Sequence, residues 1–136
     1  MKEYVLDANA LVRYYRQTPG FEIVMNLFQQ AKAGRAHLSI SVVNLSEVVY
    51  VLARYFGHEQ TLRYIEVARH SVESDLVSES VAIDTASLRI RYKLGLADCF
   101  AAELAMRTGA TLVTADPEFA KLGKQLKVLA LPRHTK

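Results

Sequence analysis

The sequence predicts an α/β fold, a three-layer α/β/α sandwich with a mainly parallel central sheet. Short apolar runs of strand length alternate with amphipathic segments of helix length, which is the pattern of a parallel sheet covered by helices on both faces. A length of 136 residues suits one hydrophobic core, so residues 1–136 are expected to form a single domain. A composition of 51% hydrophobic and 23% charged residues is typical of globular proteins.

The first half of the chain is expected to contain two strands and four helices. Apolar runs indicate buried strands at 3–6 and 36–40. Helical spacing of apolar residues indicates helices at 8–15, from 21 to Gly34, from Ser41 to Gly57, and at 59–70. Ser41 stands where an N-cap is expected, and the breaker Thr18-Pro19-Gly20 separates the first two helices.

The second half is expected to contain three strands and three helices. Strands are predicted at 76–83, 111–114 and 128–131. The first of these runs into a helix that ends at Gly95. A second helix extends from Asp98 to Gly109, and Asp116-Pro117 opens a short third helix, since proline suits a first helical turn.

Composition and charge predict a cytoplasmic protein without a membrane partner. No apolar run approaches the roughly 20 residues that cross a bilayer, and the N-terminus lacks the apolar core of a signal peptide. The single cysteine, Cys99, cannot form an internal disulfide, and we interpret it as a small core residue. Positive charge gathers at the end of the chain, because residues 119–136 include five basic residues and no acidic one.

Four acidic residues stand where an α/β fold gathers ligand-binding side chains. Asp7 and Asp116 follow the ends of two apolar runs, and ligands bind beyond the carboxyl ends of parallel strands. Asp98 stands at a helix N-terminus, and Glu47 lies one turn into a helix, three residues after Asn44. Converging carboxylates would repel one another without a cation, so we expect a hard divalent cation, Mg²⁺ or Mn²⁺. Such a cation can bind a phosphodiester oxygen and activate water.

Each acid also has a purely structural interpretation. Asp98 and Asp116 could simply cap their helices, as Asp commonly does. Glu47 could be a solvated helix residue, although its apolar neighbours would make an unpaired carboxylate costly. Asp7 is harder to explain in this way, and the four acids together favour a site. Zinc is disfavoured, because the histidines are scattered without ligand spacing: His37, His58, His70 and His134.

Four sequence motifs together resemble one nuclease family. They are, in chain order, Tyr4-Val-Leu-Asp7-Ala-Asn9, Ser41-Val-Val-Asn44-Leu-Ser-Glu47, Gly95-Leu-Ala-Asp98 and Thr114-Ala-Asp116-Pro-Glu-Phe119. Their order and spacing resemble the PIN-domain nucleases and, within them, the VapC toxins of type II toxin–antitoxin systems. The resemblance covers nearly the whole chain. It implies a PIN-like fold, a ribonuclease dependent on Mg²⁺ or Mn²⁺, a homodimer, and a VapB-like antitoxin that blocks the acidic site.

The resemblance also assigns roles to individual positions. Asp7, Glu47, Asp98 and Asp116 match the family's acidic quartet of catalytic and metal-binding residues. Three polar residues match supporting positions that orient a carboxylate or a water: Asn9, Asn44 and Thr114. Ala8 lacks the hydroxyl that many relatives carry after the first aspartate, which removes one supporting hydrogen bond. Glu118 is an additional acid beside Asp116, and we expect its side chain to point outward.

Basic and aromatic residues suggest how RNA and proteins could bind. Candidate RNA contacts near the acids are Arg13, Arg16, Arg91 and Lys93, and the alternative for such residues is a solvated helix face without a ligand. The basic tail could add a positive rim that raises association with RNA. An aromatic cluster on the two middle helices favours core packing, with a dimer or antitoxin contact as a further hypothesis: Tyr50, Tyr55, Phe56 and Tyr64.

A metal-dependent endoribonuclease is therefore the leading hypothesis from sequence. The alternative from another class is a non-catalytic PIN-fold module that binds RNA or protein. A haloacid-dehalogenase phosphatase is discounted, because it requires a second aspartate where this chain has Asn9. A receiver domain is also disfavoured, because it requires paired acids ahead of its phosphorylated aspartate.

Overall fold

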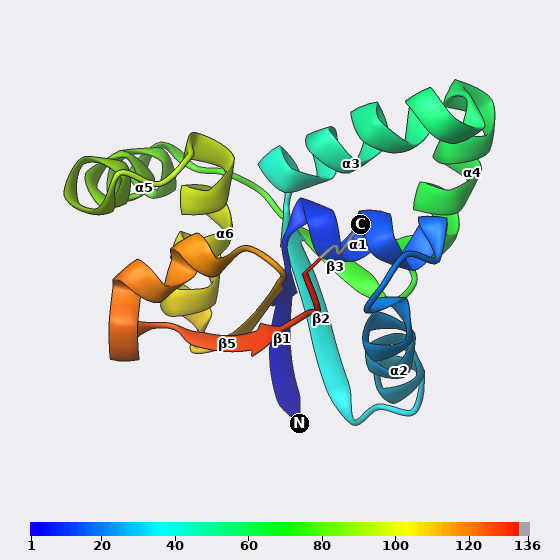
Figure 1. Ribbon diagram of the computed structural model, residues 1–136, viewed down its shortest axis with the longest axis horizontal. Helices are drawn as coiled ribbons and strands as arrows, with labels where there is room; N and C mark the ends of the chain where they lie inside the picture. Colours follow the sequence, from blue (N-terminus) through cyan, green and yellow to red (C-terminus); the bar gives the residue numbers. More distant parts are fainter. Residues whose placement is uncertain (134–136) are drawn as a thin grey trace.

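Five parallel strands form one sheet at the centre of the protein, and the computed structural model describes residues 1–133 (Figure 1). The strands are β1 (Lys2–Leu6), β2 (Ala36–Ser41), β3 (Val72–Asp75), β4 (Thr111–Thr114) and β5 (Lys127–Ala130). Their spatial order is β3-β2-β1-β4-β5, and every neighbouring pair is parallel. The predicted α/β fold with a parallel sheet is confirmed. His134 and the last base of the basic tail, Lys136, lie outside the described residues.

Helices flank the sheet and connect its strands. They are α1 (Ala8–Arg16), α2 (Phe21–Lys32), α3 (Val42–Phe56), α4 (His58–Ala68), α5 (Glu79–Tyr92), α6 (Leu96–Thr108) and the 3₁₀ segment η1 (Pro117–Gln125). In Figure 1 the first four helices lie on one side of the sheet, and α5, α6 and η1 lie on the other. Within residues 1–133, no helix is long and apolar enough to cross a membrane.

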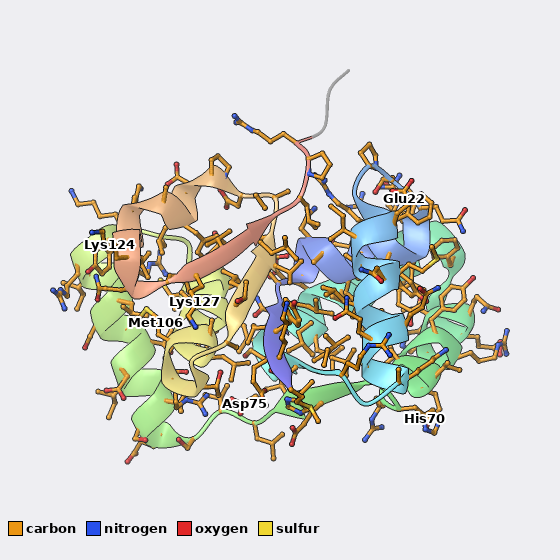
Figure 2. All side chains as sticks on the ribbon, turned by 90° about the horizontal axis from the view of Figure 1, so that it is seen from below. Glu22, His70, Asp75, Met106, Lys124 and Lys127 are labelled. Atoms are coloured by element: carbon orange, nitrogen blue, oxygen red, sulfur yellow. The ribbon has the colours of Figure 1, made fainter. Side chains whose placement is uncertain are left out.

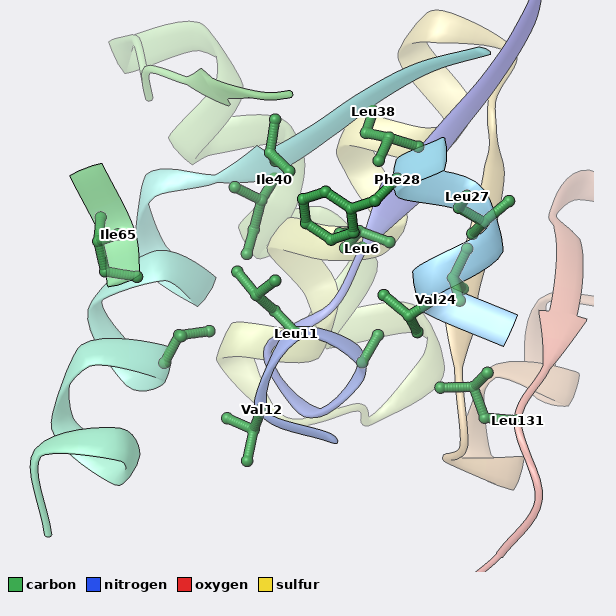
Figure 3. Close-up of a cluster of buried hydrophobic side chains, with 14 of the residues drawn as sticks. Leu6, Leu11, Val12, Val24, Leu27, Phe28, Leu38, Ile40, Ile65 and Leu131 are labelled. Carbon is green, nitrogen blue, oxygen red and sulfur yellow. The ribbon is translucent and has the colours of Figure 1, made fainter. Parts of the chain in front are cut away.

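Two hydrophobic clusters hold the three layers together. Side chains alternate between the faces of a strand, so Leu6 joins the cluster under α1–α4 while its neighbour Val5 joins the cluster under α6 and η1. Figure 3 shows the first cluster, where Phe28 of α2 and Leu11 of α1 lie against the sheet. On the other face, small buried alanines of α6 allow this helix to lie close to β1 and β4.

The third strand differs from its prediction. We expected a strand at 76–83, but β3 occupies Val72–Asp75 and pairs with β2, with Leu38 opposite Val72. Leu76 is 77% exposed, and the Ser78 hydroxyl caps α5 by accepting a hydrogen bond from the Val81 backbone N–H. The apolar run that indicated a strand therefore divides into an exposed turn and the start of α5, where Val81 is buried and Ile83 is exposed. Periodicity over eight residues does not resolve such a division. The remaining elements agree with their predicted positions to within a few residues.

The strand order places the ends of β1 and β4 side by side. The chain builds outward from β1 to β2 and β3 on one side, and then to β4 and β5 on the other. Such a reversal opens a crevice at the carboxyl ends of the central strands, where connections leave in opposite directions. Asp7 directly follows β1, and its backbone N–H donates to the carbonyl of Val113 in β4 at 3.3 Å. Residues distant in sequence thus meet at this edge.

Candidate active site

An acidic pocket lies in the crevice at the carboxyl ends of β1 and β4. It has a volume of about 380 Å³ and is lined by Asp7, Ala8, Asn9, Arg13, Asn44, Glu47, Asp98, Ala115, Asp116 and Pro117. Several of these residues belong to the first turns of α1, α3 and α6, and Figure 1 shows the starts of these helices near the end of β1. The structure therefore places all four predicted acids, together with Asn9 and Asn44, around one opening.

Asp7 is the most deeply buried of the four acids. Its side chain is only 5% exposed, and its Oδ1 accepts a hydrogen bond from the Ala10 backbone N–H at 2.8 Å, which caps α1. Burial raises the pKa of Asp7 to about 6, and the charge of Asp116 adds to this rise. The hydrogen bond from Thr114 and the one from Ala10 act in the opposite direction by favouring the ionised form. Asp7 therefore caps a helix, although the sequence offered the least reason to expect a cap at this position.

Thr114 connects two of the acids across the ends of β1 and β4. Its buried hydroxyl accepts a hydrogen bond from the Asp116 backbone N–H at 3.0 Å. The same hydroxyl also lowers the pKa of Asp7 by favouring its ionised form, so Thr114 acts on both the first acid and the last. Asp116 itself caps η1 by accepting from the Glu118 backbone N–H at 2.9 Å. The cap interpretation of Asp116 is correct, and one carboxylate can both cap a helix and line the pocket.

Asp98 does not cap its helix. The helix α6 begins at Leu96 after Gly95, and no side chain makes a capping hydrogen bond there, so Asp98 is the third helical residue. The pKa of Asp98 is raised to about 6. Burial is the largest cause, and repulsion from Asp116, Asp7 and Glu47 adds to it. A capping role therefore does not explain the position of Asp98. The other three acids are close enough for their charges to raise its pKa.

Asn44 and Glu47 enter the pocket from the first turns of α3. The Asn44 side-chain N–H donates to the carbonyl of Ala97 at 3.0 Å, which ties α3 to the residue before Asp98. The Asn44 side-chain oxygen is buried and has no hydrogen-bond partner among residues 1–133. Glu47 is exposed, so its apolar neighbours in sequence impose no burial cost on its carboxylate.

The donor chemistry of this pocket fits a hard divalent cation. Carboxylates and an amide oxygen are the ligands that Mg²⁺ and Mn²⁺ prefer, and the unpartnered oxygen of Asn44 is a buried acceptor without a donor. A cation would also remove the repulsion that raises the pKa of Asp98. Among residues 1–133, no three His, Cys, Asp or Glu side chains already stand together as a ligand set. The chemistry of the donors supports a metal site, and their present positions do not form a finished one.

The predicted RNA-binding bases lie in different environments. Arg13 lines the acidic pocket but is only 3% exposed, and its guanidinium donates to the carbonyls of Pro19 and Pro132. Arg16 lies over the ring of Tyr55, with 3.6 Å from its guanidinium carbon to the ring centroid. Arg91 and Lys93 lie at the exposed end of α5, and neither belongs to the described lining of the pocket.

Two other residues near the acids have structural partners. Glu118 forms an ion pair with Lys121 at 2.6 Å, away from the pocket lining, which agrees with the expectation that it points outward. Cys99 is fully buried, and burial raises the pKa of its thiol. The contact between Arg13 and Pro132 was not foreseen, because the two residues are 119 positions apart and no local pattern marks it.

Comparison with known proteins defines the class. The PIN domain family matches residues 4–125, so the chain belongs to the PIN domain family. The sequence matches no curated protein. These residues contain all four acids of the pocket, and the family is typically metal-dependent.

Solved structures with the same fold include VapC toxins of VapBC complexes. VapBC2 from Rickettsia felis, bound to a fragment of its promoter DNA, has a TM-score of 0.75 and 23% identity, over 94% of this chain and 98% of that one. VapBC-1 from nontypeable Haemophilus influenzae has a TM-score of 0.72 and 21% identity, over 94% and 97%. VapC20 from Mycobacterium tuberculosis, a toxin that cleaves the sarcin-ricin loop, has a TM-score of 0.68 and 14% identity, over 90% and 95%. At these identities the likeness establishes the fold.

Proposed function

We propose that this chain is a metal-dependent endoribonuclease, the toxin of a VapBC-type toxin–antitoxin pair. The observation that carries the proposal is the convergence of four acids from four segments on one pocket. Repulsion among these acids contributes to the raised pKa of Asp98, and no basic residue is positioned to neutralise it except the buried Arg13 within the described lining. Such a group of acids destabilises the fold without a cation, so its presence favours a function that uses one.

The pocket residues divide into cation-holding and positioning roles. Asp7, Asp98 and Asp116 would hold Mg²⁺ or Mn²⁺, and Glu47 would hold the cation or orient the attacking water. The cation would supply Lewis-acid activation of the phosphodiester and stabilise the leaving oxygen. Thr114 fixes the carboxylate of Asp7, and Asn44 fixes the start of α6 through Ala97. Asn9 is exposed at the pocket rim, where its amide can contact the substrate.

Protein partners follow from the same proposal. We expect a homodimer in the cytoplasm and a VapB-like antitoxin that covers the acidic pocket. Exposed aromatics on α3 support a protein contact, because Tyr50 is 65% and Tyr55 57% exposed. A monomer by light scattering of the purified chain would contradict the dimer, and an uninhibited nuclease in the presence of its antitoxin would contradict the partner.

Cleavage of a mixed-sequence single-stranded RNA tests the function directly. We expect the wild type to cleave it with Mn²⁺ and not with EDTA, and Asp7→Asn to reduce the rate by about 100-fold or more. Asparagine preserves the cap of α1, so loss of activity without loss of thermal stability would indicate chemistry. The matched control is Glu73→Gln, which removes an acid from the opposite end of the sheet. Equal cleavage by wild type and Asp7→Asn would contradict the mechanism.

The same samples distinguish the non-catalytic alternative. The absence of a finished ligand set among residues 1–133 is the observation that favours a PIN-fold module binding RNA or protein without a metal. That alternative predicts a melting temperature that does not respond to Mn²⁺ and RNA that remains intact. Metal-dependent cleavage excludes it.

A further inference from the structure

A second cavity lies beside the acidic pocket and shares a wall with it. This lateral pocket has a volume of about 300 Å³ and lies between η1 and the end of β5. Three residues line both cavities: Ala115, Asp116 and Pro117. A ligand in the lateral pocket would therefore be separated by a single stretch of chain from one bound over the acids.

The lateral pocket is built from apolar side chains. Phe119 forms part of its lining and is 2% exposed, so the base of the cavity belongs to the hydrophobic core. Ala120 and Val128 line it from η1 and β5, and both are exposed. Ala130, the last residue of β5, is also exposed and is small enough to leave space above the core. This combination provides an apolar surface that a flat ring could cover.

The outer wall of the lateral pocket is held in place by contacts with the rest of the fold. Leu131 is buried, and its backbone N–H donates to the carbonyl of Thr114 at 2.8 Å. The next residue, Pro132, accepts a hydrogen bond from the buried guanidinium of Arg13. Pro132 also packs on Gly20, where a Cβ would approach its ring carbon to 3.0 Å and where φ is +95°. The wall is thus fixed by α1 and by the turn before α2.

The charged residues in the described lining of the lateral pocket are one acid, Asp116, on the wall shared with the acidic pocket, and one base on the outer wall. Arg133 is exposed and is the one basic residue in the described lining. The described chain from Phe119 onward contains four basic residues and no acidic one. Figure 2 shows two of these, Lys124 and Lys127, on the η1–β5 side of the molecule. An apolar cavity with a cationic rim matches a nucleotide, which combines a flat base with a phosphate.

We propose that the lateral pocket holds the base of one unpaired RNA nucleotide, next to the phosphodiester that the acidic pocket receives, with Arg133 against its phosphate. This inference rests on the proposed ribonuclease function. It assigns to η1 and the end of β5 a role in selecting single-stranded RNA, because a paired and stacked base cannot enter a side cavity.

Binding of a fluorescently labelled, mixed-sequence RNA octamer tests the proposal, with Ca²⁺ in place of Mn²⁺. Ala130→Phe fills the cavity from an exposed position, and Ala120→Phe fills it independently from η1. We expect either variant to weaken binding by about tenfold, in the range that contact with one base commonly contributes. Arg133→Ala should weaken binding several-fold. The matched control Lys124→Ala removes the same charge from η1, outside the lining of the pocket.

An abasic octamer with the same number of phosphates separates base binding from charge. We expect Ala130→Phe to bind this probe as the wild type does, whereas Lys124→Ala weakens both probes equally. Unchanged melting temperatures would show that the variants fold. The proposal is overturned if both cavity-filling variants bind the RNA octamer like the wild type, which would leave the cavity for a protein partner. It is also overturned if they weaken both probes equally.

Cleavage measured on the same proteins keeps this proposal separate from the function on which it rests. Normal cleavage together with unchanged binding in both cavity-filling variants would reject the base pocket and retain the ribonuclease. Base-dependent binding by a wild type that never cleaves RNA in Mn²⁺ would retain the pocket and reject the ribonuclease.

Discussion

The two ends of the sheet both gather acidic side chains, but they treat the resulting charge differently. Near the amino ends of the strands, His37 of β2 lies 2.8 Å from Glu3 of β1 and 2.8 Å from Glu73 of β3. Beside α6, Arg107 similarly pairs with Glu103 at 2.9 Å and Asp75 at 2.7 Å. Asp75 is the last residue of β3, so this second set of pairs is not at the amino ends, but in both places the chain itself supplies the cation.

At the carboxyl ends, four acids share a pocket whose described lining contains one basic residue, Arg13. Both hydrogen bonds of the Arg13 guanidinium come from its Nη1, which donates to two backbone carbonyls, so this nitrogen is directed away from the acids. Burial is the main cause of the raised pKa values of Asp7 and Asp98, and repulsion from the neighbouring acids adds to both. The difference teaches that an acid cluster indicates a cation-dependent function when the fold leaves it unneutralised, and a structural role when the fold pairs it.

The largest expected change in stability comes from removing the buried guanidinium of Arg13. Arg13→Met should lower the free energy of unfolding by about 3 kcal/mol, because two backbone carbonyls lose a buried donor. Arg107→Met should cost at most about 1 kcal/mol, because its ion pairs are partly exposed. Urea denaturation measures both values. Equal losses of unfolding free energy in the two variants would contradict the distinction between the buried Arg13 and the partly exposed Arg107.

Manganese should stabilise one end of the sheet specifically. At a concentration 100 times its Kd, Mn²⁺ should raise the free energy of unfolding of the wild type by about 2.7 kcal/mol. Asp98→Asn should remove most of this gain, whereas Glu73→Gln should retain it. Thermal melts over a series of MnCl₂ concentrations, with calorimetric titration for the Kd, provide the measurement. A gain that survives in Asp98→Asn would place the cation elsewhere.

Without metal, Asp7 should make stability depend on pH. Its pKa rises from 3.8 to about 6 on folding, so the folded state retains a proton that the unfolded state releases between these values. Its stabilising contribution is complete below pH 4 and is lost as pH rises through 6, a change of up to about 3 kcal/mol. Comparing Asp7→Asn with the wild type in EDTA, by urea denaturation from pH 4 to 7, isolates this contribution. Parallel pH curves would contradict it.

The smallest expected effect lies at the paired end. Hydrogen bonds with Glu3 and Glu73 raise the pKa of His37, so its stabilising contribution is complete below pH 6.5 and is lost as pH rises through the higher value. His37→Gln should lower the free energy of unfolding by less than about 1 kcal/mol at pH 5.5, since the pairs are exposed, and by less at pH 8.5. A larger loss of unfolding free energy at pH 8.5 than at pH 5.5 would contradict a raised pKa for His37.

Much of the fold followed from local sequence. Periodicity located the strand Thr111–Thr114 at its observed bounds, and Ser41 caps α3 as expected, accepting from the Val43 backbone N–H at 3.2 Å. These features depend on residues close in the chain, which is why they are predictable. The failure at 76–83 has the same origin, since a short apolar run fits a strand or one face of a helix equally well.

The candidate site was only partly accessible from sequence. Motif order singled out the acids, but the sequence left open whether Asp98 and Asp116 were merely caps. Asp116 and Asp7 do cap helices and Asp98 does not, because capping depends on backbone geometry at the first turn. The order of the four motifs therefore predicted the candidate site better than the local sequence around any single acid.

By itself, the sequence determined the alternation of strands and helices, the parallel sheet and the identity of the four pocket acids, because each of these depends on local spacing and residue type. Tertiary structure decided which charges meet. It brought His37 between two glutamates, turned Arg13 toward the carbonyl of Pro132, and left the pocket acids facing one another. The reason is physical: electrostatic energy depends on distance and burial in space, and residues 119 positions apart acquire both only when the chain folds.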